Sequence, residues 1–255
     1  MNESKRTFTD DEIIRRVWDL ENIKDLMGRR AFYLANEQRQ RELDELWVRE
    51  EENRKSASLG RNWGFYVGMD AIRDYYVVKH AEDRRSKLAE YCAARPELEL
   101  CDGNLGYGCM TAHPSTTPWV YLAQDGKTAQ GVFFAMAQDT TGHPDGSCDA
   151  VNINELMAVD FIREESGWKI WHLFLGTDLI YASGRNVEDI SCDVPVEENP
   201  VYQEFGTPTL PMLAHNDRLH WSDYDDFWPK DYETYDPARS YGPDRWLNRK
   251  EKVGW

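Results

Sequence analysis

Apolar residues recur at helical spacing through the first fifty positions of the chain. Residues 9–12 read T-D-D-E, a capping box of the kind that begins a helix. The apolar stripe that follows consists of Ile13, Val17, Leu20, Ile23 and Met27. We predict two helices, or one bent helix, over residues 10–52, in which Gly28 indicates a break or a close contact.

Glycines at positions 60, 64 and 68 then interrupt the pattern and indicate a loop. After them, Asp70 caps a predicted helix that extends to about residue 94, where Arg95–Pro96 favours a stop.

From about residue 105 the pattern changes from helical to alternating. Two strands joined at Asp125–Gly126 form a predicted hairpin. A polar loop follows at 140–149, and a second strand pair turns at 165–167. Helices followed by an antiparallel meander predict an α+β fold, with the helices packed on one face of a curved sheet.

The final segment, residues 185–255, has no clear periodicity but contains seven prolines and eleven aromatic residues. A disordered tail would be poor in aromatics. We therefore expect an irregular extension over 185–255 that packs on the domain or on a partner subunit.

Charge and cysteine content narrow the classes of partner. The formal net charge of −16 argues against nucleic acid and anionic membrane surfaces, which both require basic patches. No apolar run is long enough for a membrane span, and the N-terminus lacks the apolar core of a signal peptide. The five cysteines show no CxxC spacing, so we expect no metal site and a cytoplasmic location.

Three segments together resemble one known family. They are W-G-F-Y-V-G-M-D-A-I at 63–72, the hairpin at 113–133, and D-F-I-R-E-E-S-G-W-K-I-W-H at 160–172. In order and spacing they resemble the SnoaL-like branch of the nuclear transport factor 2 superfamily. The resemblance implies a cone-shaped α+β barrel over residues 10–184, in which a strongly curved, mainly antiparallel sheet wraps around the N-terminal helices and encloses a pocket.

His172 is the first candidate for chemistry. Strand alternation places it on the same face as Trp168 and Ile170. The resemblance implies that this face lines the cone, where an imidazole could transfer protons. The alternative is a core histidine bonded to a backbone carbonyl.

Asp160 is predicted on the partner strand, where it could orient His172 or act as a base. The alternative is a carboxylate that faces solvent or pairs with Arg163 or Lys169. A histidine at the position of His113 is frequent in the resembled family, and a strand-end role is equally open.

Further candidates lie on the helices. Tyr76 and His80 share a helical face, with Lys79 on the neighbouring stripe, so Tyr76 and Lys79 could supply an acid or an oxyanion donor. The resemblance implies that Tyr33 lies on a pocket-lining helix. Core tyrosines and a surface lysine are the alternative.

Aromatic residues could form the wall of the pocket, or could simply pack in the core. The substrate-binding set that we predict is Trp63, Phe65, Tyr66, His80, Phe174 and Trp119.

No phosphate loop, GxSxG elbow or HExxH motif is present. Together with the resemblance, this predicts a cofactor-independent acid–base lyase, performing elimination, dehydration or retro-aldol loss of formaldehyde. We expect a small aromatic, plant- or lignin-derived phenolic substrate and a homo-oligomer, either dimer or trimer. An isomerase or cyclase of a polycyclic ketone, or a ligand-binding protein without catalysis, is the alternative.

Overall fold

A computed structural model describes residues 7–98, 105, 108–182, 206–211 and 227–247 of the chain. Most helices come first in the sequence and most strands follow them. The helical elements are α1 (Asp10–Ala35), α2 (Arg39–Leu46), α3 (Glu51–Ser56), α4 (Met69–Arg73), the π-helix η1 (Asp74–Lys79), α5 (His80–Ala93), the 3₁₀ turn η5 (Pro237–Arg239) and α8 (Pro243–Leu247). The strands are β1 (Ser58–Arg61), β2 (Gly64–Val67), β3 (Cys109–Ala112), β4 (Thr116–Leu122), β5 (Thr128–Gly142), β6 (Cys148–Glu164), β7 (Gly167–Ala182) and β8 (Leu210–Pro211).

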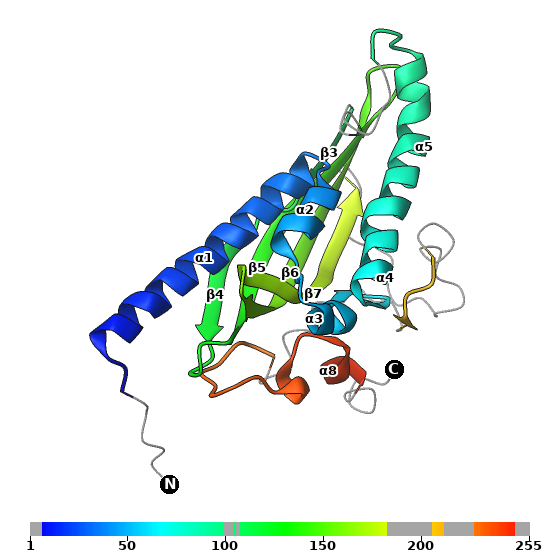
Figure 1. Ribbon diagram of the computed structural model, residues 1–255. Helices are drawn as coiled ribbons and strands as arrows, with labels where there is room; N and C mark the ends of the chain where they lie inside the picture. The colour runs from blue at the N-terminus through cyan, green and yellow to red at the C-terminus, as the bar shows by residue number, and fades with distance from the viewer. Residues whose placement is uncertain (1–6, 99–104, 106–107, 183–205, 212–226, 248–255) are drawn as a thin grey trace.

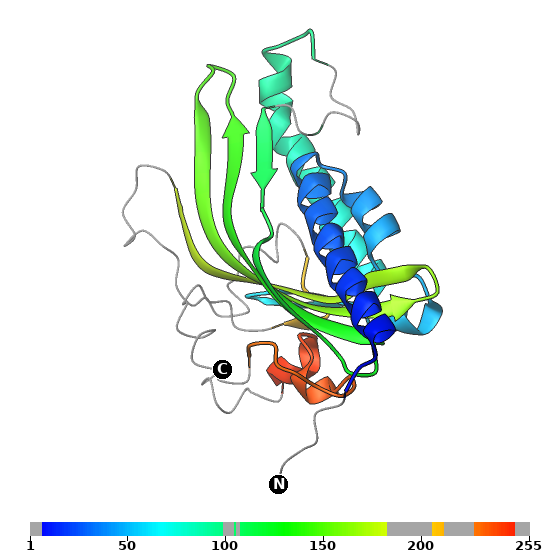
Figure 2. The same ribbon diagram turned by 90° about the vertical axis from the view of Figure 1, so that its left-hand side faces the viewer.

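The strands form one strongly curved sheet in the order β3-β5-β6-β7-β1-β2-β8, with β4 also paired to β5. All named strand pairs are antiparallel except β1 with β7. Helices α1, α2 and α5 lie on one face, which we call the inner face (Figures 1 and 2). The predicted α+β class is therefore confirmed. The described strands do not close into a barrel.

A local sequence signal accounts for the start of α1, but two other local predictions are wrong. Asp70 does not cap a helix, because α4 begins at Met69 after Gly68. The glycines at 60, 64 and 68 do not make a loop, because β1 and β2 pair there as antiparallel strands. Thr9 forms the predicted capping box with Glu12, each side chain accepting from the other residue's backbone N–H. Helix α1 passes through Gly28 without a break, and no atom lies near the position that a Cβ there would take. The prediction of a break or close contact at Gly28 is therefore wrong. Within the described residues, no helix is long and apolar enough to cross a membrane.

The hairpins follow from turn chemistry. Gly126 has φ 72°, and Asp125 Oδ1 accepts from the N–H of Lys127 at 2.9 Å, so the predicted turn is confirmed. The polar loop predicted at 140–149 is wrong in extent, because β5 runs to Gly142 and pairs there with Cys148. Polar residues suit these strand ends because both faces of the sheet are partly exposed there.

Residues 227–247, which we call the C-terminal cover, pack on the outer face of the sheet below the helical layer (Figure 1). Phe227 and Tyr241 are fully buried against Ala158 of β6 and Phe174 of β7. The Tyr241 hydroxyl also donates to the carbonyl of Phe227 at 2.6 Å. This segment thus buries an apolar sheet face that α1, α2 and α5 leave uncovered.

Candidate functional site

A small cavity of about 70 Å³, which we call the central cavity, lies between the inner face of the sheet and the helices. Its lining is partly apolar, from Leu34, Leu59, Ile153 and Leu175. The polar part of the lining is supplied by Arg30, Arg39, Arg61, Tyr75, Tyr76, His80, Thr111, His113 and Asp139. The sheet and the helices therefore both contribute polar groups to one cavity.

The imidazole of His113, just after β3, is held between two carboxylates. Its Nδ1 lies 3.2 Å from Glu155 Oε1, and its Nε2 lies 3.3 Å from Asp139 Oδ1. Glu155 is on β6 and Asp139 on β5, so the sheet positions both partners. Glu155 is fully buried, whereas the side chain of Asp139 is 40% exposed. The histidine thus connects a buried charge to the wall of the cavity.

These carboxylates favour the charged form of the ring. Burial opposes a charge on His113, but Glu155 and Asp139 outweigh burial and raise its pKa to about 9. Burial likewise favours neutral Glu155, yet His113, Arg61 and Arg30 lower its pKa to about 2. At neutral pH the site therefore holds an imidazolium next to a carboxylate.

A second buried carboxylate, Glu42 of α2, links this helix to α1 and η1. Glu42 accepts from the Tyr76 hydroxyl at 2.6 Å and from Trp47 Nε1 at 3.3 Å, and it pairs with Arg30 at 3.3 Å. Burial and the charge of Glu42 raise the pKa of Tyr76. Tyr76 is therefore a stable phenol and not a base. The tyrosine lies in a π-helical turn, an irregularity that is frequent at functional sites.

Arg39 separates the central cavity from a wider hollow of about 380 Å³, which we call the outer hollow. Its guanidinium lies over the Tyr76 ring at 4.8 Å, and its Nε donates to Glu37 Oε2 at 3.1 Å. Glu37 itself has φ 54°, a left-handed conformation that is costly for a residue other than glycine. A strained residue thus holds the side chain that divides the two spaces.

The structure places His172 and Asp160 outside the cavity, so the prediction that they line it is wrong. Residue Trp171 has no partner on β6, because Ile170 pairs with Phe161 and His172 with Asp160. A one-residue bulge of this kind reverses the alternation beyond it. Ile170 therefore faces the helices, while His172 lies on the outer face.

On that face both residues serve the packing of the C-terminal cover. Asp160 accepts from Ser240 Oγ and from the N–H of Tyr241, both at 2.6 Å. Burial raises the pKa of Asp160 to about 6. His172 Nδ1 lies 2.9 Å from Ser58 Oγ, and burial lowers its pKa to about 3, so the ring is neutral.

Several other predicted residues also lie away from the cavity. Tyr33 donates to Glu45 at 2.6 Å near the surface, and Lys79 pairs with Glu82. The aromatic residues predicted as the pocket wall are elsewhere. Phe65 and Phe174 pack on the outer face, Trp119 is 46% exposed, Tyr66 stacks behind Tyr75, and Trp63 packs against Arg61. Of the predicted set, Tyr76, His80 and His113 line the cavity.

Sequence reasoning missed the arginines and their carboxylates. One signal was present, because Arg30 continues the stripe of Ile23, Met27 and Leu34, all of which are buried. An arginine on a core stripe must find a buried partner. No local pattern pointed to Arg61 or Glu155, since Arg61 stands among glycines that read as a loop and Glu155 reads as an ordinary charged strand residue.

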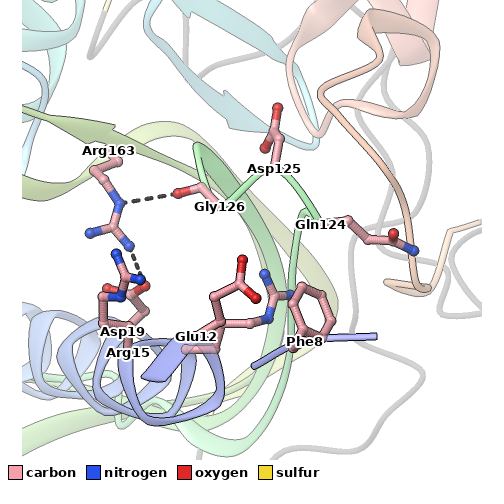
Figure 3. A pocket seen from close by; sticks show the side chains of 9 residues that line it. Phe8, Glu12, Arg15, Asp19, Gln124, Asp125, Gly126 and Arg163 are labelled. Carbon is pink, nitrogen blue, oxygen red and sulfur yellow. Dashed lines mark hydrogen bonds and ion pairs between the residues drawn. The ribbon is translucent and has the colours of Figure 1, made fainter. Parts of the chain in front are cut away.

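A third hollow, of about 320 Å³, lies at the N-terminal end of α1 (Figure 3). Arg163 there pairs with Asp19 and donates to the carbonyl of Gly126 at 3.1 Å. Arg16 donates to the carbonyls of Leu122 and Ala123. These two arginines connect α1 to the β4–β5 hairpin. The lining of this hollow contains no histidine. Among the described residues, no group of acidic, histidine or cysteine side chains is arranged to hold a metal.

The sequence matches no protein-family model and no curated protein. Matching solved structures include an NTF2-like protein with a cystatin-like fold from Novosphingobium aromaticivorans. It is 16% identical, with 68% of this chain and 92% of that chain covered, at TM-score 0.45. A hexachlorocyclohexane dehydrochlorinase from Novosphingobium barchaimii is 12% identical, with 68% and 96% covered, at TM-score 0.43. A protein of unknown function from Mycobacterium tuberculosis is 14% identical, with 79% and 96% covered, at TM-score 0.46.

The matches thus include proteins described as NTF2-like, which is the superfamily that the sequence motifs resemble. At such identities and TM-scores they carry no argument about function. The geometry of the cavity is therefore the basis for a function.

Proposed function

We propose that the central cavity is the site of a cofactor-independent acid–base lyase that acts on a small molecule. The observation that carries this proposal is the His113 imidazole, which is bonded to Glu155 and Asp139 and lines the central cavity. Elimination needs one group that accepts a proton and one that donates a proton. The His113–Asp139 pair offers both within 3.3 Å.

In the proposed reaction, the Asp139 carboxylate removes a proton from a substrate carbon. The imidazolium of His113 gives a proton to the leaving oxygen, so that a double bond forms and water departs. Glu155 remains ionised and holds the ring in position. Arg39 and Arg61 face the same space and would stabilise negative charge that develops on the substrate.

The size of the cavity limits the substrate. An apolar cavity of about 150 Å³ binds benzene, so about 70 Å³ does not admit an aromatic ring unless Arg39 moves. Displacement of Arg39 would join the cavity to the outer hollow of about 380 Å³. We propose that a single-ring phenolic substrate would bind across both spaces. A polycyclic ketone fits this arrangement less well.

The test is turnover by the full chain of a panel of small phenolic and hydroxylated compounds, followed by mass spectrometry for loss of water or formaldehyde. His113→Gln should reduce turnover by about 10²- to 10⁴-fold. His143→Gln is the matched control, because His143 also pairs with a carboxylate, Asp149, but lies on an exposed loop. Equal turnover by these two variants would refute the proposal, as would the absence of turnover across the panel.

A further inference from the structure

The charged groups around the central cavity are not balanced. Glu37 serves two cations, since it accepts from Arg39 Nε and Arg84 Nη2, both at 3.1 Å. Glu155 also serves two, since it bonds His113 and Arg61. Two carboxylates thus share four cations.

Two further carboxylates bond to cations that line the central cavity. Asp139 is the second partner of His113, and Glu42 neutralises Arg30, which lies on the other side of the cavity. With His113 protonated, these bonded groups carry one more positive charge than negative. An excess charge that is largely withdrawn from water is costly, so an anion that enters the cavity would gain from neutralising it.

Arg61 has unused hydrogen-bonding capacity. Its Nε is buried and has no hydrogen-bond partner among the described residues. Its closest carboxylate contact, from Nη1 to Glu155 Oε2, is long at 3.4 Å. A guanidinium has five N–H donors in a planar fork that matches both oxygens of a carboxylate. Arg61 is also 20% exposed and lines the cavity, so a ligand can reach it.

A neighbouring titratable group responds to the same positive charge. His80 lines the cavity beside Tyr75, with the two rings 5.2 Å apart. Burial lowers the pKa of His80, and Arg39, Arg61 and Arg84 lower it further. The charges of three arginines thus act together on a ring that lines the cavity.

We propose that the central cavity binds the carboxylate of a small organic monoanion, with the Arg61 guanidinium as its main ligand. The excess of a single charge favours a monoanion over a phosphate dianion, and about 70 Å³ suits a group of few atoms. This inference rests on the proposed function in that the same cavity would hold the substrate, which would then be a carboxylic acid.

The experiment measures binding of propionate and of its neutral analogue propionamide to the full chain by calorimetry. Propionate should bind and raise the melting temperature, whereas propionamide should do neither. Arg61→Gln should weaken propionate binding by about 10- to 100-fold, the value of a charge-assisted hydrogen bond. Arg61→Lys keeps the charge but loses the fork, so it should bind more weakly than the wild type. Arg163→Gln, at the N-terminal hollow, is the control and should bind as the wild type does.

Equal binding of propionate and propionamide would overturn the inference, as would undiminished propionate binding by Arg61→Gln. If Arg61→Gln does not fold, Arg61→Lys decides, and wild-type affinity in that variant counts against the inference. The binding experiment measures no turnover, so its outcome is separate from that of the turnover panel. If propionate binds but no compound of the panel is turned over, only the proposed function is contradicted. Turnover of neutral substrates in preference to acids contradicts only the present inference.

Discussion

The charge on His113 should make the stability of the protein depend on pH in a specific direction. The ordinary pKa of a histidine is about 6.5, and the folded protein raises that of His113 to about 9. One pKa unit corresponds to about 1.4 kcal/mol, so this shift contributes about 3 kcal/mol to the free energy of unfolding. His113 is only 7% exposed, so little of this is screened by water.

The sign follows from the direction of the shift. A group whose pKa is raised on folding stabilises the protein fully below its unfolded pKa. The contribution of His113 is therefore complete below about pH 6.5 and is lost as pH rises through about 9. Glu155 behaves in the opposite way, since its pKa is lowered to about 2. Its contribution is present above about pH 4.5 and is lost as pH falls through about 2.

The assay is urea unfolding of the wild type and His113→Gln at about pH 6 and about pH 10. The variant cannot be protonated, so the difference in unfolding free energy between the two proteins should shrink by about 3 kcal/mol over this range. Groups that do not contact His113 titrate alike in both proteins and cancel in the difference. His143→Gln, on the exposed loop, should show no such change.

A difference between the wild type and His113→Gln that stays constant from pH 6 to pH 10 would refute the reasoning. It would mean that the imidazole is neutral, and that the ring cannot act as the proton donor in the proposed reaction.

Two further predictions concern the scaffold. Gly60→Ala should destabilise the protein by about 1–3 kcal/mol, because a Cβ there would lie 2.6 Å from the Phe174 ring. Gly28→Ala is the matched substitution in open space and should stabilise helix α1 by about 1 kcal/mol. Thermal unfolding measures both, and a similar effect of the two substitutions would contradict the packing. Asp160→Ala should release the C-terminal cover at a cost of about 1–3 kcal/mol, because it removes the acceptor for Ser240 and for the Tyr241 amide. Hydrogen exchange at Tyr241 should accelerate, and unchanged exchange would show that Asp160 is not the anchor.

Signals that involve only a few neighbouring residues were readable from the sequence. The capping box at Thr9 and the turn at Gly126 each depend on backbone conformations and hydrogen bonds within four residues. The order of helices and strands was likewise enough to predict the α+β class, because the spacing of apolar residues distinguishes a helix from a strand.

Which face of the sheet each residue of β7 lies on depended on one position, Trp171. Strict alternation predicts that His172 shares a face with Ile170, and the extra residue Trp171 reverses this. A bulge forms where a strand must bend to pair with its neighbouring strands. One neighbour of β7 is β1, which lies far away in the chain. The sequence around 172 therefore carries no sign of it.

The composition of the site was also decided by tertiary packing. His113 follows β3, Glu155 lies on β6 and Arg61 on β1, and the folded sheet brings their charges within bonding distance. The sequence pointed to His113 as a candidate, but Glu155 and Arg61 alone resemble ordinary surface charges. Local sequence thus set the fold class and several of the elements. The folded sheet decided which charged groups were removed from water together, because burial and pairing of charges are properties of neighbours in space.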